Sequence, residues 1–287
     1  MMETPLVTVV LPLKYYVKAF MNAAVQSIVD QSDPNWRMVI VVEPADQEKF
    51  RSLLEVPLGD ARIALITNQR RGFAGAINSG VAHAETPFAA ILLGDDMWAE
   101  NAVAVLNREI RENPGVDFFH SSRRFIDEKN EPISKVYESR DSFKMSDFKW
   151  GSPAKHLLCW RKSKWAEIGG IDETVLKASD DYDFPWSMAE NGAVFKAVKE
   201  CLYLYRNHCD GERFTTHRPL STSKRGIKGI LKKHGIGLIE RNWIIWKLRS
   251  GGSLGTQSIY RNAFDRWIKE KIGYDASGKW QQQEYQQ

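Results

Sequence analysis

The sequence predicts an α/β protein with a central, mostly parallel sheet flanked by helices. Short apolar runs that read as buried strands alternate with segments of helical spacing through residue 112. Two pairs of adjacent carboxylates, Asp95-Asp96 and Asp180-Asp181, lie next to apolar segments and outside any solvated charge run. In open α/β sheets ligands bind beyond the carboxyl ends of the strands. The first pair follows a predicted strand, so it is expected to face a binding site.

Four buried strands are expected in the first part of the chain, because each is a continuous apolar run. They cover residues 7–12, 38–42, 61–67 and 88–93, and Pro12 is expected to end the first. Helices are expected over 20–31, 73–83 and 99–112, and 116–121 is a further candidate strand.

The second half is less regular, with a polar stretch from Asp127 to Lys149. A helix is expected over 182–191, with Pro185 tolerated in its first turn, and short strands over 193–198 and 202–205. The predicted C-terminal helices are 227–233, 236–248 and 260–272, with a break at 251–253 and a frayed end from 274.

Composition excludes several classes of protein. The 287 residues are 43% hydrophobic, enough for one large domain or a domain with an extension. No stretch approaches the ~20 apolar residues that span a bilayer, and no signal peptide is visible. The three cysteines, Cys159, Cys201 and Cys209, are too few for a disulfide framework. We therefore predict a cytoplasmic protein and no nucleic-acid partner.

Positive charge is concentrated near the C-terminus. Residues 224–249 contain eight Lys or Arg and one Glu, a charge of +7 in a chain whose total is +4. Two alternatives follow. This segment either docks at the inner face of an anionic membrane or on a lipid-linked acceptor, or it forms a helical pair packed on the core or at the contact of a homo-oligomer.

The two carboxylate pairs suggest different chemistry. Adjacent carboxylates are hard to keep ionised without a cation, so Asp95 and Asp96 favour a divalent metal with oxygen ligands. The second cluster can then supply a general base. The simpler alternative is helix capping, by the first pair before Ala99 and by Asp180 before the helix that follows it.

Several motifs occur in one order along the chain. They are the strand ending at Pro12, the strand ending at Glu43, the segment 68–80 with Asn68, Gly72 and Asn78-Ser79-Gly80, the turn Leu93-Gly94-Asp95-Asp96, the turn 169–173 and the cluster 179–183. This order resembles the inverting family 2 glycosyltransferases with the GT-A fold, from Leu6 to His208. The match is partial, since Leu93 holds the position of the first aspartate of the family's metal motif.

The resemblance implies a GT-A (nucleotide-diphospho-sugar transferase) catalytic domain over 1–220 and a basic helical extension over 221–287. Residues 1–98 would bind the nucleotide-sugar and 99–220 would form the acceptor half. The implied reaction moves a sugar from a UDP-, GDP- or dTDP-sugar to a glycan or lipid-linked acceptor, in polysaccharide or glycoconjugate synthesis. Two rivals are a nucleotidyltransferase and a non-catalytic sugar-binding protein. The first lacks support because no glycine-rich loop follows the first strand.

The resemblance also suggests site residues on the donor side. Asp95 is expected to be the main ligand of Mn²⁺ or Mg²⁺, with Asp96 second or water-mediated and His208 near the metal. Donor-binding candidates are Pro12, Lys14, Glu43, Arg71 and Asp95. Glu43 would accept a hydrogen bond from the nucleobase, and Arg71, at a helix N-terminus, would meet phosphate.

On the acceptor side the resemblance points to the second acidic cluster. Asp181 is the expected catalytic base, with Asp180 and Asp183 in support. Trp150, His156 and Trp160 lie where the family forms its acceptor site, and aromatic faces stack well on sugar rings. Ordinary core packing is the alternative for each tryptophan.

Overall fold

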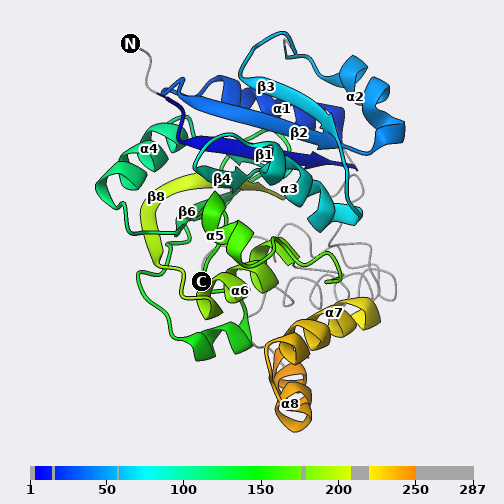
Figure 1. The fold of residues 1–287 in the computed structure, drawn as a ribbon, viewed down its shortest axis with the longest axis vertical. Helices are drawn as coiled ribbons and strands as arrows, with labels where there is room; N and C mark the ends of the chain where they lie inside the picture. The colour runs from blue at the N-terminus through cyan, green and yellow to red at the C-terminus, as the bar shows by residue number, and fades with distance from the viewer. Residues whose placement is uncertain (1–3, 15–16, 57, 176–178, 208–219, 250–287) are drawn as a thin grey trace.

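The computed structural model describes residues 4–14, 17–56, 58–175, 179–207 and 220–249. One sheet of eight strands has the order β3-β2-β1-β4-β7-β6-β8-β5 (Figure 1). The strands are β1 (Val7–Leu13), β2 (Trp36–Val42), β3 (Ile63–Thr67), β4 (Phe88–Ile91), β5 (Met97–Trp98), β6 (Phe118–Ile126), β7 (Leu158–Arg161) and β8 (Phe195–Arg206).

The helices fall between these strands and after the last one. They are α1 (Lys18–Val29), α2 (Gln47–Leu53), α3 (Gly72–His83), α4 (Ala102–Glu112), α5 (Lys162–Glu167), α6 (Phe184–Glu190), α7 (Leu220–Lys233) and α8 (Leu238–Arg249). Two short 3₁₀ helices, η1 (Pro44–Asp46) and η2 (Met145–Trp150), and a π-helical turn, η3 (Ser179–Asp183), complete the described elements. The helix predicted over 260–272 and the break at 251–253 lie outside the described residues.

The first half of the sheet is parallel, as predicted. Strands β3, β2, β1 and β4 pair side by side in one direction. Pro12 does not end β1, which runs on to Leu13. Pairing of β1 with β4 stops at Val10 and Ile91, where the Leu92 N–H bonds to the Val10 carbonyl. Pro12 lies two residues farther along on the same side of β1, beyond the end of β4. Its missing N–H therefore costs no hydrogen bond between strands. The carboxyl ends of all four strands meet at one edge.

The second half of the sheet is mixed. Strand β7 enters antiparallel between β4 and β6, while β8 runs parallel to β6. The two short strands expected over 193–205 are one continuous strand, whose register with β6 shifts where Val198 opposes Ser121 and Cys201 opposes Ser122. This irregularity bends the pair. The predicted strand over 116–121 is β6 itself, which extends to Ile126.

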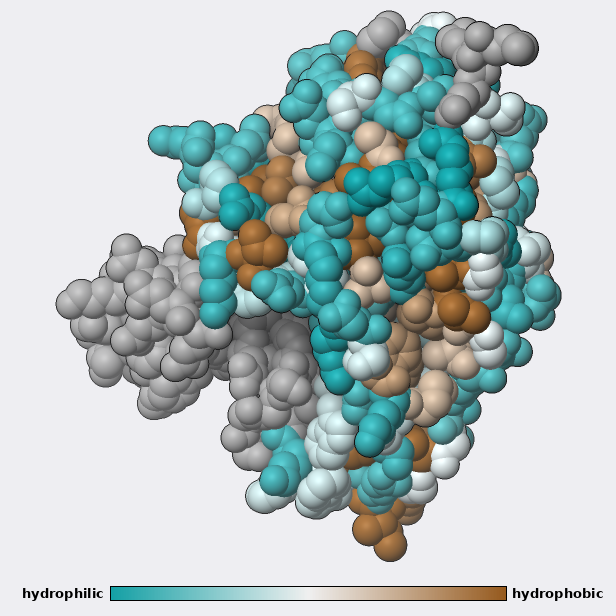
Figure 2. Space-filling view, turned by 90° about the vertical axis from the view of Figure 1, so that its left-hand side faces the viewer, coloured by the Kyte–Doolittle hydropathy of each residue, from teal (hydrophilic) through white to brown (hydrophobic). Residues whose placement is uncertain are grey.

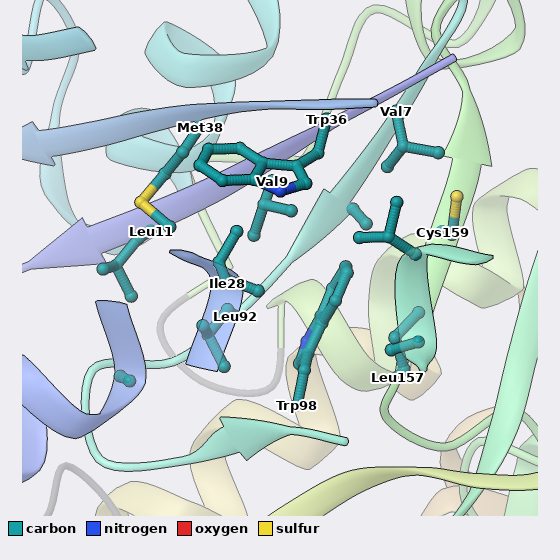
Figure 3. Packing of buried hydrophobic residues seen from close by; sticks show 14 of the residues in the cluster. Val7, Val9, Leu11, Ile28, Trp36, Met38, Leu92, Trp98, Leu157 and Cys159 are labelled. Atoms are coloured by element: carbon teal, nitrogen blue, oxygen red, sulfur yellow. The ribbon is translucent and has the colours of Figure 1, made fainter. Parts of the chain in front are cut away.

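Two apolar layers cover the sheet. One buries side chains of α1, α2 and α4 against alternate residues of β1 and β2, such as Val9 and Met38. Figure 3 shows this layer, in which Ile28, Trp36, Leu92 and Trp98 gather from separate elements. The opposite layer packs α3, α5 and α6 against the other face. The fold therefore has three layers, as the alternation of strands and helices predicts.

Helices α7 and α8 lie at the lower end of the molecule, below the sheet (Figure 1). Their residues Ile230, Leu231 and Ile244 are fully buried against Phe148 of η2 and Trp186 of α6. Of the two alternatives for the basic segment, packing on the core therefore accounts for these apolar side chains. Within the described residues, no helix combines the length and the hydropathy that crossing a bilayer requires.

Candidate active site

Asp95 and Asp96 follow β4 at the edge where the parallel strands end. The carboxylate of Asp96 is 1% exposed and accepts two hydrogen bonds, from the hydroxyl of Tyr203 at 2.7 Å and from the backbone N–H of Arg206 at 2.8 Å. Burial, and then the charge of Asp96, raises the pKa of Tyr203, which keeps its hydroxyl a donor. Asp95 is only half-buried. Neither carboxylate caps α4, which begins after Asn101.

Arg206 is a residue that the sequence did not indicate. It is fully buried, and its guanidinium donates from Nε to the Asp95 carbonyl and from Nη1 to the Asp127 carbonyl, both at 2.8 Å. Its positive charge acts directly on the Asp95-Asp96 pair. In the sequence, Arg206 directly follows the mostly apolar run 201–205, but nothing there shows that it is buried and paired.

Asp180 and Asp181 belong to the π-helical turn η3, a rare conformation that recurs at functional sites. Asp180 is 8% exposed, whereas Asp181 is half-buried and reaches solvent. Burial, and then the charge of Asp181, raises the pKa of Asp180 well above its usual range. Asp180 lies inside this turn and not at the start of α6, so the capping alternative does not describe it.

His156 joins the two acidic clusters. Its Nε2 lies 3.7 Å from a carboxylate oxygen of Asp180, and its ring stacks on Tyr203 with centroids 5.1 Å apart. Burial lowers the pKa of His156 to about 4, and the negative charges of Asp181 and Asp95 oppose that shift. Both clusters therefore act on one buried imidazole, which brings segments from distant parts of the chain into one site.

Two cations accompany this imidazole. Arg123 lies in β6 opposite Tyr203, and Lys155 directly precedes His156. Partial removal from water, and then the charge of Arg123, lowers the pKa of Lys155 to about 8, although its side chain remains accessible. Neither residue forms an ion pair within the described parts of the chain, and Nε of Arg123 has no hydrogen-bond partner there. Neither cation was predicted from the sequence.

Asp183 is the residue of this cluster that points elsewhere. Its carboxylate is 1% exposed and contacts Nζ of Lys233 at 2.7 Å and Nε2 of His234 at 3.1 Å, both at the end of α7. These contacts favour an anchoring role for Asp183 over the supporting catalytic role expected from the sequence.

The donor-side candidates gather beyond β1, β2 and β3. Glu43 follows β2, and its carboxylate accepts a hydrogen bond of 3.2 Å from the Asn68 amide. Arg71 stands at the N-terminus of α3 with an exposed side chain, and Lys14 follows Leu13 in the same exposed state. Pro12 is buried in β1. The strands thus bring these residues to the edge that also carries Asp95.

The acceptor candidates separate in the structure. His156 lies in the site described above, but Trp160 is 1% exposed and packs between Phe118 and Phe184 in the core. Trp160 is therefore a packing residue and not an acceptor contact. Trp150 is half-buried, and its ring meets that of Trp243 in α8 edge-on at 5.2 Å.

A metal would rely on few protein ligands here. Within the described ranges, no three His, Cys, Asp or Glu side chains are grouped to hold an ion, and His208 lies outside these ranges. Asp96 is committed to Tyr203 and Arg206, which leaves Asp95 as the accessible carboxylate. This fits a Mg²⁺-type ion that takes one or two carboxylates and completes its shell with substrate phosphates and water.

Comparisons with known proteins agree with this arrangement. A sequence model described as Glycosyl transferase family 2 matches residues 8–164. The chain is 28% identical over 211 residues to "Uncharacterized glycosyltransferase MJ1057" of Methanocaldococcus jannaschii, covering 71% of this chain and 72% of that one. It is also 27% identical over 126 residues to the Escherichia coli protein named "UDP-Glc:alpha-D-GlcNAc-diphosphoundecaprenol beta-1,3-glucosyltransferase WfgD", covering 44% of this chain and 48% of the relative.

A solved structure shares the fold. The crystal structure of S. aureus TarS 1-349 in complex with UDP-GlcNAc superimposes with a TM-score of 0.58 at 14% identity, over 92% of this chain and 80% of that one. The family match covers more than half of the 287 residues and includes the strands that bring Asp95 to the sheet edge. The chain therefore belongs to glycosyl transferase family 2 and is a glycosyltransferase with the GT-A α/β fold.

Proposed function

We propose that this glycosyltransferase is inverting and moves a sugar from a UDP-sugar to an acceptor hydroxyl that Asp181 deprotonates. One observation carries the proposal. His156 stacks on Tyr203, whose hydroxyl bonds to Asp96 next to Asp95, and Nε2 of His156 lies 3.7 Å from Asp180 next to Asp181. A donor held near Asp95 and a hydroxyl near Asp181 would therefore share one site.

In the proposed reaction the acceptor oxygen attacks the anomeric carbon from the face opposite the leaving group, and the bond to the diphosphate oxygen breaks. Asp181 takes the proton of the attacking hydroxyl. Its partial exposure suits this role, because the hydroxyl must reach it. Asp180 is buried and has a raised pKa, and we do not assign it a proton transfer with substrate.

We propose that Mn²⁺ or Mg²⁺ is held by Asp95 together with the donor diphosphate, with Asp96 orienting the loop through Tyr203 and Arg206. When bound, the ion offsets the charge that develops on the departing nucleoside diphosphate. The TarS complex with UDP-GlcNAc supports uridine as the base, with GDP- and dTDP-sugars as the alternatives. Glu43, with its carboxylate held by Asn68, is the proposed nucleobase contact.

For the acceptor we propose a glycan or lipid-linked sugar that carries phosphate. The name of the E. coli relative includes a diphosphoundecaprenol acceptor. Arg123 and Lys155 supply positive charge beside Asp181 and form no ion pair within the described residues, so they suit an acceptor phosphate. Lys155→Met should then raise the KM for a phosphorylated acceptor while leaving the KM for the donor unchanged.

We further propose that α8 contacts an anionic membrane surface. Residues Ile239, Trp243 and Trp246 share one helix face at spacings of four and three residues, and are 87%, 47% and 59% exposed. Brown hydrophobic atoms lie at the lower tip in Figure 2, the end at which Figure 1 places α8. Tryptophan beside basic residues such as Lys247 is typical of interfacial helices.

Vesicle co-sedimentation tests this contact. Binding to phosphatidylglycerol vesicles at low salt, but not to phosphatidylcholine vesicles, is expected, and Ile239→Ser should weaken it. Val194→Ser is the matched control, because Val194 is also exposed but lies directly before β8 and away from α8. Equal binding to both lipids, or an equal loss of vesicle binding in both variants, would contradict a membrane contact. The exposed face of α8 would then contact another protein or have no partner.

The central experiment is a donor screen with Mn²⁺ and a sugar-lipid or glycan acceptor. Release of UDP with acceptor present, and a product of opposite anomeric configuration by NMR, are the expected results. Release of pyrophosphate from a sugar phosphate and a nucleoside triphosphate would instead indicate a nucleotidyltransferase. Donor binding without any turnover across acceptors would favour a sugar-binding protein.

A further inference from the structure

The end of α7 is bonded to the turn that carries the proposed base. Lys233 Nζ lies 2.7 Å from Asp183, the last residue of η3, and His234 Nε2 lies 3.1 Å from the other oxygen of the same carboxylate. Asp181 is two residues away in the same five-residue turn. A segment far along the chain thus fixes the end of this turn.

The contact is buried and geometrically constrained. The side chains of His234 and Asp183 are each 1% exposed. The His234 ring lies parallel to Trp186, with centroids 4.1 Å apart and 4° between the planes, and its Nδ1 contacts Glu190 at 2.8 Å. Both ends of the imidazole are therefore held by acidic residues of η3 and α6. Such a ring has no room to reorient.

Lys233 extends the network to a second segment. Its Nζ also contacts Asp172 at 2.9 Å, so one ammonium joins the turn after α5 to η3. Burial opposes the charged form, but hydrogen bonds to Asp183 and Asp172 prevail and raise the pKa of Lys233. The neighbouring Lys232 is exposed and has no such contact with the described part of the chain.

The turn itself needs such support. Adjacent Asp180 and Asp181 repel each other, and a π-helical turn is less favourable than α-helix. Beneath the ion pairs, Tyr182 of the turn packs with Trp186 and Ile230, and its hydroxyl bonds to the Phe148 carbonyl at 2.7 Å. Apolar packing places the turn against α7, while the ion pairs fix its rotation.

We propose that Lys233 and His234 are positioning residues that orient the Asp181 carboxylate toward the acceptor hydroxyl. The proposal rests on the proposed role of Asp181 and adds that α7, which lies beyond the residues matched by the family model, completes the active site. Neither residue contacts substrate. They act through Asp183 and the backbone of η3.

The test compares Lys233→Met with Lys232→Met, a matched control one residue away. Lys233→Met should lower kcat for transfer roughly 10- to 100-fold, since small misplacements of a reacting group cost this much, with the donor KM unchanged. Lys232→Met should be normal, and Lys233→Arg should restore part of the rate. Amide hydrogen exchange over residues 179–190 should quicken in Lys233→Met only.

Asp183→Asn provides the second variant, because it keeps the shape of the side chain while removing its charge. Normal kcat in a folded Lys233→Met or Asp183→Asn protein would overturn the proposal. Global unfolding of both Lys233→Met and Asp183→Asn would also overturn the proposal, because the contact between Lys233 and Asp183 would then serve the stability of the fold alone. If the unaltered enzyme transfers no sugar, the proposed function fails, whereas hydrogen exchange still reports whether Lys233 holds the turn.

Discussion

The side-chain amide of Asn78 pairs with the backbone of Ile171, donating to its carbonyl at 2.8 Å and accepting from its N–H at 2.9 Å. The same amide accepts a bond from Nε1 of Trp165 at 3.2 Å and donates to Glu173 at 3.0 Å. Asn78 lies in α3 and Ile171 in the turn before η3, so one side chain joins a helix of the parallel half to the segment that leads to η3.

Replacing Asn78 should therefore lower stability. Asn78→Ala leaves the buried N–H and carbonyl of Ile171 without partners, at a cost of about 1–3 kcal/mol in the free energy of unfolding. Asn191→Ala removes an exposed bond to the Ser187 carbonyl and should change stability by less than about 0.5 kcal/mol. Urea denaturation of both variants makes the comparison. Equal effects would mean that solvent or rearrangement replaces the Asn78 bonds.

The same substitution should have opposite effects in two helices. A Cβ on Gly80 of α3 would lie 2.4 Å from Val10 and 3.1 Å from Val41, so Gly80→Ala should destabilise by about 1–3 kcal/mol. In α7, a Cβ on Gly229 meets nothing within 4 Å, and Gly229→Ala should stabilise by about 0.5–1 kcal/mol. Thermal unfolding should move in opposite directions, and a shared direction would contradict the packing of α3.

The two carboxylates after β4 should separate into different functions. Asp95→Asn should weaken Mn²⁺-dependent UDP binding. Asp96→Asn should cost about 1–3 kcal/mol in the free energy of unfolding, because the Tyr203 hydroxyl and the Arg206 N–H bond to different carboxylate oxygens and an amide has only one oxygen. Calorimetric titration with UDP, with and without chelator, measures the effect on binding, and thermal unfolding measures the effect on stability in each variant. Metal-independent UDP binding in the unaltered protein would remove the metal proposal.

Asp181 and Asp180 form a matched pair for catalysis. Asp181→Asn removes the proposed proton acceptor and should lower transfer by at least ~100-fold with donor binding near normal. Asp180→Asn should be milder, since the raised pKa of Asp180 already favours its neutral form, which an amide resembles. Steady-state rates of transfer and titrations with the donor compare the two variants. An inactive Asp180→Asn beside an active Asp181→Asn would show that the base was assigned to the wrong residue.

His120 should make stability depend on pH. It is 1% exposed, and burial, with a smaller contribution from Lys199, lowers the pKa of His120 to about 4. Between about pH 6.5 and 4 the unfolded chain binds a proton that the folded protein does not, so stability falls as pH falls through this window. His120→Gln should reduce that slope, by at most about 3 kcal/mol across the window. Urea midpoints of the unaltered protein and of His120→Gln at several pH values provide the measurement. Parallel plots of stability against pH for the two proteins would contradict this role of His120.

Continuous apolar runs made the parallel half of the fold predictable. Residues 38–42 and 88–93 contain no polar alternation, and they form the buried strands β2 and β4. Pro12 was misleading, because a proline normally ends a strand and only the tertiary position of β4 shows that its missing N–H faces no strand. Strand β5 has two residues, which is too short for an alternation of polar and apolar residues to be recognised in the sequence.

Candidate site residues could be named from the sequence where the pattern is local, but not where it depends on pairing between distant segments. Adjacent carboxylates are visible in the sequence, so Asp95 and Asp181 could be named. Arg206 could not, because its bonds to Asp95 and Asp96 join positions about 110 residues apart. Trp160 was assigned to the acceptor site from its position in the family resemblance and its aromatic character, and only its burial shows that it belongs to the core.

The contact between Asp183 and Lys233 also has a consequence for biosynthesis. Lys233 leaves the ribosome 50 residues after Asp183, whereas the strands of the parallel half are complete by residue 91. During translation the N-terminal part of a chain can fold first. The nascent protein thus has the parallel half of its sheet in place while the buried carboxylate of Asp183 still lacks Lys233 and His234, so a chain that stops before α7 would emerge with that carboxylate unpaired by them.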